Sequence, residues 1–297
     1  MVYFRLPRIA GLIAVGLLSS TALIAQQPTC VPAGTISRLG TLPEASGLAA
    51  SRRTPRMFWA QNDSGDPMVF ALNEAGQTIG RVRITGVTVH DWEDIAIGPC
   101  PQGSCLYIAD IGDNNGRRPQ IVIYRVPEPA PGDTRTTTAE AMRATYADGP
   151  QDAEAVIALP DGTLLIVTKG DTGPVALYRF PTPFQNGGTV SLQRLAVLVP
   201  SPGTHRAVSR SQRVTGGSAS ADGREIVLRT NDVVMFYDAR EFSAGRIHEL
   251  SRIDVTRLRE PQGEGIAIAA NGDVWLSGEG GDGRMPGTLA HLSCARP

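Results

Sequence analysis

Acidic and amide side chains occupy two kinds of position that recur along this sequence. A carboxylate opens a short apolar stretch, as Glu93 does, and Asp, Gly and Asn follow the next apolar stretch, as they do after residues 106–109. In an antiparallel pair, the start of the first strand and the end of the second lie at the same sheet edge. We therefore expect Glu93 to lie near Asp110, Asp113 and Asn114.

Because the same unit recurs, these side chains would converge on one centre. Several carboxylates around one axis repel each other unless a cation or a proton intervenes. Oxygen ligands from carboxylates and amides suit Ca²⁺ best, and Mg²⁺ or Mn²⁺ less well. The alternative is that each acid only caps its strand, by accepting backbone amides of the neighbouring strand. The predicted metal ligands are Glu44, Asn62, Asp63, Glu93, Asp110, Asp113, Asn114, Glu154 and Glu264.

Three basic side chains stand near these acids. His90 precedes the acidic stretch and is the candidate general base, with Asp91 or Asp94 orienting it, so His90 and Asp94 are the predicted catalytic residues. A loop histidine without a role is the alternative. Lys169 could bind an anionic group of a ligand or pair with a carboxylate of the ring. Arg229 lies beside the unit that lacks an opening acid and is expected to supply positive charge there, to a ligand.

Charge and motifs exclude several classes of protein. The first 25 residues hold two Arg and no acid, so the remainder carries 26 Lys and Arg against 29 Asp and Glu, a net charge of −3. A polyanion such as nucleic acid is therefore not an expected partner. The sequence contains no Gly-x-Ser-x-Gly elbow, P-loop, dinucleotide fingerprint or His-Glu-x-x-His motif.

The start of the chain is typical of a secretory signal peptide over residues 1–25. Arg5 and Arg8 precede an apolar run over residues 9–18, and small residues lead to Ala25. A retained membrane anchor is the alternative, but the run is short for a stable span. We therefore expect a secreted or periplasmic protein whose mature domain covers residues 26–297, with no membrane contact after cleavage.

Four cysteines follow the signal segment: Cys30, Cys100, Cys105 and Cys294. An even count in an exported protein suggests two disulfides, and three pairings are possible. Cys100 and Cys105 could close a short loop, which would leave Cys30 with Cys294 and join the two ends. A metal site is the alternative, although no His or Cys lies at ligand spacing nearby.

Short strands separated by turn signals predict an all-β repeat fold. Five units of four strands open near residues 44, 93, 152, 214 and 264, and the unit near 214 lacks an acid. The last unit lacks its fourth strand, which the strand expected at 35–42 could supply. The pattern predicts a single β-propeller of five four-stranded blades, closed by that N-terminal strand. Six blades are the alternative, if 127–149 or 200–213 hide strands, and a two-sheet sandwich is less favoured.

Six acidic motifs recur along the chain: Glu44-Ala-Ser-Gly-Leu-Ala, Asn62-Asp-Ser-Gly, Asp91-Trp-Glu-Asp-Ile-Ala, Asp110-Ile-Gly-Asp-Asn, Asp152-Ala-Glu-Ala and Glu264-Gly-Ile-Ala. In these motifs the chain after the signal segment resembles, over nearly all of its length, a group of exported bacterial propeller proteins that are often compared with phytase-like esterases or called WD40-like or TolB-like. More distantly, acids on inner strands resemble those of calcium-dependent propellers: gluconolactonases, paraoxonases and β-propeller phytases. That resemblance implies a Ca²⁺ at the channel that polarises a lactone or phosphoester and binds its oxyanion.

Two functions are consistent with this sequence. The first is a metal-dependent hydrolase of lactone, ester or phosphoester bonds, in which Glu44, Glu93, Glu154 and either Asn62 or Asp113 hold the ion. The second is a monomeric exported propeller that binds a small molecule or an exported protein, catalyses nothing, and carries a structural cation or none.

Overall fold

The computed structural model describes residues 1–3, 28–203, 206–281 and 285–296, and these residues form an all-β structure. The predicted signal peptide lies almost entirely outside the described residues. Within the described part of the chain, no helix has the length and apolar character needed to cross a membrane.

The strands form four hydrogen-bonded sheets. The first has the order β2-β3-β4-β5-β9, with β2 (Ala45–Ala50), β3 (Met57–Asn62), β4 (Met68–Asn73), β5 (Thr78–Thr85) and β9 (Arg135–Thr138). The second has the order β11-β12-β13-β14-β10-β8-β7-β6, with β6 (Trp92–Cys100), β7 (Gly103–Asp110), β8 (Ile121–Pro127), β10 (Glu140–Tyr146), β11 (Ala153–Ala158), β12 (Leu164–Thr168), β13 (Val175–Phe180) and β14 (Thr189–Val199).

The remaining sheets have four strands each. One is β15-β16-β17-β18, with β15 (Gly216–Ala219), β16 (Glu225–Arg229), β17 (Val233–Asp238) and β18 (Glu249–Asp254). The other is β1-β21-β20-β19, with β1 (Thr29–Leu39), β19 (Gln262–Ile268), β20 (Val274–Glu279) and β21 (Gly287–Ala295). The short helix α1 (Ala239–Ser243) and the 3-10 turns η1 (Arg210–Gln212) and η2 (Thr256–Leu258) complete the described elements.

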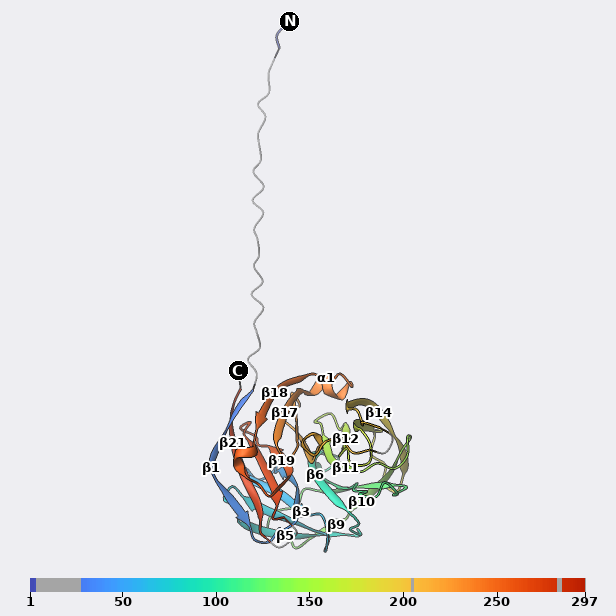
Figure 1. Cartoon of the computed structure of the whole chain (residues 1–297), viewed down its shortest axis with the longest axis vertical. Helices are drawn as coiled ribbons and strands as arrows, with labels where there is room; N and C mark the ends of the chain where they lie inside the picture. The colour runs from blue at the N-terminus through green and yellow to red at the C-terminus, as the bar shows by residue number, and fades with distance from the viewer. Residues whose placement is uncertain (4–27, 204–205, 282–284, 297) are drawn as a thin grey trace.

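Five strands lie side by side around the centre of the molecule. β2 contacts β6 and β19, β11 contacts β6 and β15, and β15 contacts β19. Each of them begins a run of antiparallel strands that leads outward, so β6, β11 and β19 appear near the middle of Figure 1 while β1, β5 and β14 lie at the rim. This radial arrangement of sheets is the architecture of a propeller.

The burial of each strand follows from its distance to the centre. All six residues of β11 are buried, because other strands cover both of its faces, and its sequence AEAVIA is correspondingly apolar apart from Glu154. The outer strand β5 alternates instead, with Val82 and Ile84 buried between exposed residues. The core lies between neighbouring sheets, where Phe58 and Trp275 bring their ring centroids to 4.9 Å.

Residues 127–149 contain two strands that the sequence did not assign clearly. β10 pairs antiparallel with β8 and parallel with β14, and β9 pairs parallel with β5. The segment Ala139-Glu140-Ala141-Met142-Arg143 could be read from its sequence as a helix, but its residues belong to β10 or lead directly into it. Both strands cover sheet edges that would otherwise expose unpaired backbone groups.

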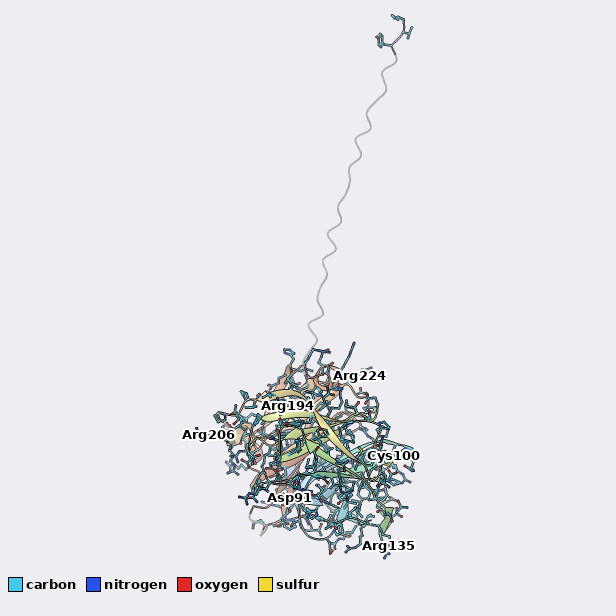
Figure 2. The ribbon with its side chains drawn as sticks, turned by 90° about the vertical axis from the view of Figure 1, so that its right-hand side faces the viewer. Asp91, Cys100, Arg135, Arg194, Arg206 and Arg224 are labelled. Carbon is cyan, nitrogen blue, oxygen red and sulfur yellow. A yellow bond between two sulfur atoms is a disulfide. The ribbon has the colours of Figure 1, made fainter. Side chains whose placement is uncertain are left out.

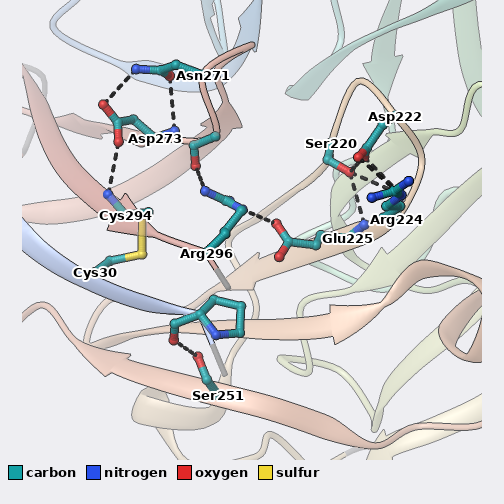
Figure 3. A network of polar contacts seen from close by, with 12 residues as sticks. Cys30, Ser220, Asp222, Arg224, Glu225, Ser251, Asn271, Asp273, Cys294 and Arg296 are labelled. Carbon is teal, nitrogen blue, oxygen red and sulfur yellow. Dashed lines mark hydrogen bonds and ion pairs between the residues drawn. A yellow bond between two sulfur atoms is a disulfide. The ribbon is translucent and has the colours of Figure 1, made fainter. Parts of the chain in front are cut away.

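The two predicted disulfides are confirmed. Cys30 on β1 lies opposite Cys294 on the antiparallel strand β21, and the two are bonded (Figure 3). Cys100 and Cys105 close the turn between β6 and β7. Beside the first disulfide, the Cys294 amide donates a 2.9 Å hydrogen bond to Asp273 Oδ1, which fixes the end of β21.

Candidate functional site

The hairpins at the centre are irregular at one recurring position. The register of β6 with β7 shifts at Glu93, and that of β11 with β12 shifts at Glu154. The shift between β19 and β20 includes Glu264, and that between β2 and β3 includes Ser46, whereas β15 and β16 pair without a shift. A bulge re-aims its side chain and is common beside functional sites. The hairpin without a shift belongs to the unit that lacks an acid.

These shifts correct the comparison of units made from the sequence. The sequence pattern makes Glu44 the counterpart of Glu93, but the position of the shift gives that place to Ser46. Glu44 instead corresponds to Asp91 and Asp152, each two residues before the shifted Glu. Asp152 was absent from the predicted ligands, although the Asp-x-Glu spacing that it shares with Asp91 is visible in the sequence.

Three buried carboxylates, which we call the three-carboxylate cluster, meet at the centre: Glu93, Asp152 and Glu154. One carboxylate oxygen from each lies within 4.8 Å of the others, and the residues are 7%, 1% and 2% exposed. Asp152 Oδ1 accepts a 2.7 Å hydrogen bond from the Asp113 amide. Its Oδ2 is buried and has no hydrogen-bond partner among the described residues. A buried, unpartnered carboxylate oxygen is costly, so it indicates a place for a ligand.

Lys169 is the basic residue that forms an ion pair with this cluster. It directly follows β12, its amide donates a 2.9 Å hydrogen bond to the Asp152 carbonyl, and its ammonium forms an ion pair with Glu154. The structure thus pairs Lys169 with a ring carboxylate, one of the two roles considered from the sequence. With Asp91 beside Glu93, four carboxylates lie near this ammonium, and the Arg118 guanidinium also acts on Asp91.

The pKa values at the cluster follow from burial and like charges. Burial raises the pKa of Glu93 well above its ordinary value, and the charges of Glu154 and Asp91 raise it further. Burial raises the pKa of Glu154 to about 7, against the opposing effect of Lys169. Burial would lower the pKa of Lys169, but Glu154 and Asp152 raise it above its ordinary value. The cluster is therefore short of positive charge.

A cavity of about 470 Å³ opens beside the cluster. Asp91, half-buried, links the two, because it lines the cavity and its carboxylate lies close enough to Glu93 for its charge to raise the Glu93 pKa. A Cβ on Gly112 would overlap both Glu93 Oε1 and the Asp91 carboxylate, so only glycine leaves room for this pair. The lining residues are His90, Asp91, Gly112, Asp113, Asn114, Asn115, Arg118, Gln120 and Val122.

The two predicted catalytic residues have different surroundings. His90 is exposed and lines the cavity. Asp94 is fully buried and accepts backbone hydrogen bonds from Ile95, at 2.8 Å, and from Val156, at 2.9 Å. Asp94 thus joins β6 to β11 and is absent from the cavity wall, which is the capping arrangement that was the alternative for the opening acids.

The predicted ligands of the 106–114 region shape the cavity loop. Asp110 is fully buried and forms a 2.5 Å ion pair with Arg118, while its other oxygen accepts the His90 amide. Asp113 accepts the backbone amides of Arg117, at 2.9 Å, and Arg118, at 2.8 Å. Neither carboxylate joins the three-carboxylate cluster. Asn114 is exposed on the cavity wall.

The remaining predicted ligands are Glu44, Asn62, Asp63 and Glu264. Together with Glu279, the three acids among them form a second acidic group at the same edge of the sheets as Asp91. Asn62 Oδ1 accepts the Glu44 amide at 3.2 Å. Burial raises the pKa of Asp63 to about 7, and the charges of Glu44 and Glu279 add to the rise. Burial also raises the pKa of Glu264 well above its ordinary value. The described residues show no set of three ligand atoms here comparable to the three-carboxylate cluster.

Arg229 is fully buried, and protein groups occupy all of its nitrogens. Its guanidinium donates to the carbonyls of Thr230, at 3.3 Å, Gly265, at 3.2 Å, and Ser277, at 3.0 Å, and forms a 2.9 Å ion pair with Glu260. The positive charge expected beside the unit without an opening acid is present, but it is used inside the protein and does not face the cavity.

The site is open on one side of the ring. Figure 2 shows Asp91 and Arg206 toward one side of the molecule. It shows Cys100, the last residue of β6, and Arg224, in the turn between β15 and β16, toward the other side. Between the inner strands on that second side, Ala158, Ala219 and neighbouring residues leave only about 10 Å³. A ligand therefore reaches the carboxylates from the Asp91 side.

No protein-family model and no curated protein matches the sequence. Solved structures do match. The Mala s 1 allergen of Malassezia sympodialis is 10% identical with a TM-score of 0.56, over 88% of this chain and 96% of that chain. A gluconolactonase of Xanthomonas campestris is 13% identical with a TM-score of 0.50, over 91% and 96%. The PQQ-bound aldose sugar dehydrogenase of Streptomyces coelicolor is 12% identical with a TM-score of 0.50, over 91% and 99%.

At such low identity these similarities show the fold alone. They support a distant resemblance to propellers, and they show neither a TolB-like nor a phytase-like protein. The chain therefore has a propeller-type fold, of the kind seen in lactonases and sugar dehydrogenases.

Proposed function

We propose that this chain is an exported propeller that holds a divalent cation, preferably Ca²⁺, in the three-carboxylate cluster and hydrolyses lactone or ester bonds in the adjoining cavity. The observation that carries the proposal is the convergence of Glu93, Asp152 and Glu154, three buried carboxylates with one unpartnered oxygen. A gluconolactonase among the similar folds fits this reaction class.

The donor set fits a hard cation. Ca²⁺ takes six to eight oxygen ligands, and carboxylates can each offer one or two. The four carboxylates of Asp91, Glu93, Asp152 and Glu154 outnumber the two cations that act on them, Lys169 and Arg118, so a bound cation would relieve their repulsion. When bound, the ion would polarise a carbonyl group and stabilise the negative charge that develops on its oxygen.

Side chains of the cavity wall would bind the substrate and transfer the proton. Amide side chains of Asn114, Asn115 and Gln120 line the cavity and can hydrogen-bond a polar substrate. His90 lies on the same wall with an exposed imidazole, where it can accept a proton from attacking water. Asp91 connects this wall to Glu93, so it would orient the substrate relative to the ion.

The proposed architecture is a ring of five four-stranded blades closed by β1. The five inner strands that contact one another in a circle support this count, and the pairing of β1 with β21 supplies the fourth strand of the last blade. The strands in 127–149 extend existing sheets, which argues against a sixth blade in that stretch. Export is supported by the two disulfides, which persist in oxidising compartments.

The test is Glu93→Gln, with thermal melts in Ca²⁺ and in chelator and assays on lactones, esters and phosphoesters. We expect Ca²⁺ at 100 times its dissociation constant to stabilise the natural protein by about 2.7 kcal/mol. Glu93→Gln should lose this stabilisation together with turnover. Asp66→Asn is the control, because Asp66 is exposed and pairs only at the surface with Arg83. Turnover that survives in Glu93→Gln contradicts the proposal.

A propeller that binds a small molecule or an exported protein without catalysis is the second candidate. One observation favours it: no side chain of the described residues hydrogen-bonds the imidazole of His90, so nothing orients that group as a base. Under this function, Glu93→Gln would alter stability, and no substrate of the panel would turn over with either protein.

A further inference from the structure

The strongest further feature is the position of Lys169, the only lysine among the 28 Lys and Arg of the sequence. We infer that its ammonium is a built-in counter-ion that a divalent cation must displace from Glu154 in order to bind, so that Lys169 sets the affinity of the site. This inference rests on the proposed cation site, whose failure the experiment below separates from its own.

The backbone of Lys169 is fixed at the cluster. Its amide donates to the Asp152 carbonyl at 2.9 Å, and its carbonyl accepts the Val214 amide at 3.2 Å. The side chain therefore starts beside the cluster and reaches Glu154, whose own side chain is 2% exposed. The Lys169 side chain is 21% exposed, so part of it faces solvent while Glu154 is enclosed.

An ammonium and a divalent ion cannot share this place. Lys169 contacts Glu154 Oε1, and a cation held by Glu93, Asp152 and Glu154 would draw on the same carboxylate. Two positive charges within a few ångströms repel strongly where water is scarce. Binding of the ion thus requires the lysine to move, and the energy of the ion pair is subtracted from the binding energy of the ion.

Lysine suits an exchangeable counter-ion better than arginine would. Its ammonium is a compact charge on a flexible four-carbon stem, whereas a guanidinium holds a carboxylate through two parallel hydrogen bonds. Arg229 shows the contrasting case in this chain, because its guanidinium is fully buried and fixed by four protein groups. Lys169 has one carboxylate partner and a solvent-exposed side.

The experiment compares Ca²⁺ binding by the natural protein, Lys169→Met and Lys169→Arg, with calorimetry and with melts in chelator. Lys169→Met should bind Ca²⁺ at least about tenfold more tightly, which corresponds to about 1.4 kcal/mol. In chelator it should melt at a lower temperature, since Glu154 then loses the ammonium that pairs with it. Lys169→Arg, which keeps the charge and holds it more firmly, should bind Ca²⁺ no more tightly than the natural protein.

The outcomes distinguish the two levels of the proposal. If the natural protein binds Ca²⁺ and Lys169→Met binds it equally or less tightly, Lys169 is no competitor and the inference is overturned. If neither protein binds Ca²⁺, Mg²⁺ or Mn²⁺, the cation site itself, and with it the proposed function, fails.

A second measurement needs no variant, in case Lys169→Met does not fold. Acylation of Lys169 in the natural protein can be followed by mass spectrometry of its peptide, with and without Ca²⁺. Displacement from Glu154 should raise the labelling rate of this lysine several-fold when Ca²⁺ is bound. A labelling rate that stays constant while the ion binds overturns the inference.

Discussion

At the scale of single residues, Asp152 is the most informative carboxylate. It is 1% exposed, one oxygen holds the Asp113 amide, and the other has no partner among the described residues. A purely structural acid would use both oxygens, as Asp94 does between Ile95 and Val156. This contrast within one chain supports the proposal that Asp152 is a cation ligand, whereas Asp94 has the structural role of joining two strands.

Asp152→Asn tests this contrast. The amide oxygen can still accept the Asp113 amide, while the cluster loses one negative charge beside Glu93 and Glu154. We expect the affinity for Ca²⁺ to fall at least about tenfold, or about 1.4 kcal/mol. In chelator the melting temperature should stay equal or rise, because a repulsion is removed. Calorimetric titration and paired melts measure both effects; Asp66→Asn should change neither. An unaltered affinity would remove Asp152 from the site.

The second acidic group predicts how stability depends on pH in chelator. Burial and the charges of Glu44 and Glu279 raise the pKa of Asp63 from 3.8 to about 7. Between these values the folded state holds a proton that the unfolded state has lost, so stability falls as pH rises from about 4 to 7. Urea unfolding at pH 5 and pH 7.5 should show this fall, and Asp63→Asn should reduce it. An equal fall in both proteins would show that other groups cause it.

At the scale of elements, the register shifts position the acids. Glu93 is the extra residue where β6 pairs with β7, and its carboxylate fits beside Asp91 only because Gly112 has no side chain. The hairpin β15–β16, which pairs regularly, carries no acid at the corresponding place. Three of the four shifted hairpins thus carry a glutamate at the shift, the fourth carries Ser46 there, and the regular hairpin carries no acid.

Gly112→Ala tests whether the close placement of Asp91 and Glu93 supports the cation site. The new Cβ would overlap Glu93 Oε1 and the Asp91 carboxylate, so both side chains must move away from the cluster. Ca²⁺-dependent stabilisation should be lost in paired melts, with a smaller change in chelator. Gly132→Ala is the matched control, since a Cβ there meets no atom within 4 Å. A variant that keeps the full response to Ca²⁺ would show that the Asp91–Glu93 pair does not support the site.

The sequence predicts the strands better than their register. Apolar runs and turn residues located nearly all strands, and the even cysteine count led to both disulfides. A one-residue shift is invisible in such patterns, so Glu44 was compared with Glu93 and Asp152 was missed. The parallel pairs β10–β14 and β5–β9 join segments far apart in the chain, and no local propensity specifies them.

At the scale of the whole molecule, long-range pairings hold the sheets together. β10 joins two runs of strands into one eight-stranded sheet, β9 extends the sheet of β5, and β1 joins β21 from the other end of the sequence. Contacts of this kind close long loops, which costs chain entropy that burial must offset. The free energy of unfolding should therefore depend on cross-links that restrict the unfolded chain.

The two disulfides test this dependence because their loops differ so much in length. Cys30 and Cys294 are separated by 264 residues, and Cys100 and Cys105 by 5. In the chain-entropy model, loss of the first would cost about 5 kcal/mol and loss of the second about 2 kcal/mol, as upper figures.

Equilibrium unfolding of the Cys30→Ala/Cys294→Ala and Cys100→Ala/Cys105→Ala double variants measures the two costs. Loss of the long-range disulfide should destabilise the protein more, and it should free β1 from β21 before other strands open. Hydrogen exchange of the β1 and β21 amides measures this local opening. If removal of the short-range disulfide proves equally costly, or if β1 stays fully protected without Cys30 and Cys294, the proposed closure by β1 does not depend on this cross-link. Closure would then rest on the β1–β21 hydrogen bonds and the packing around them alone.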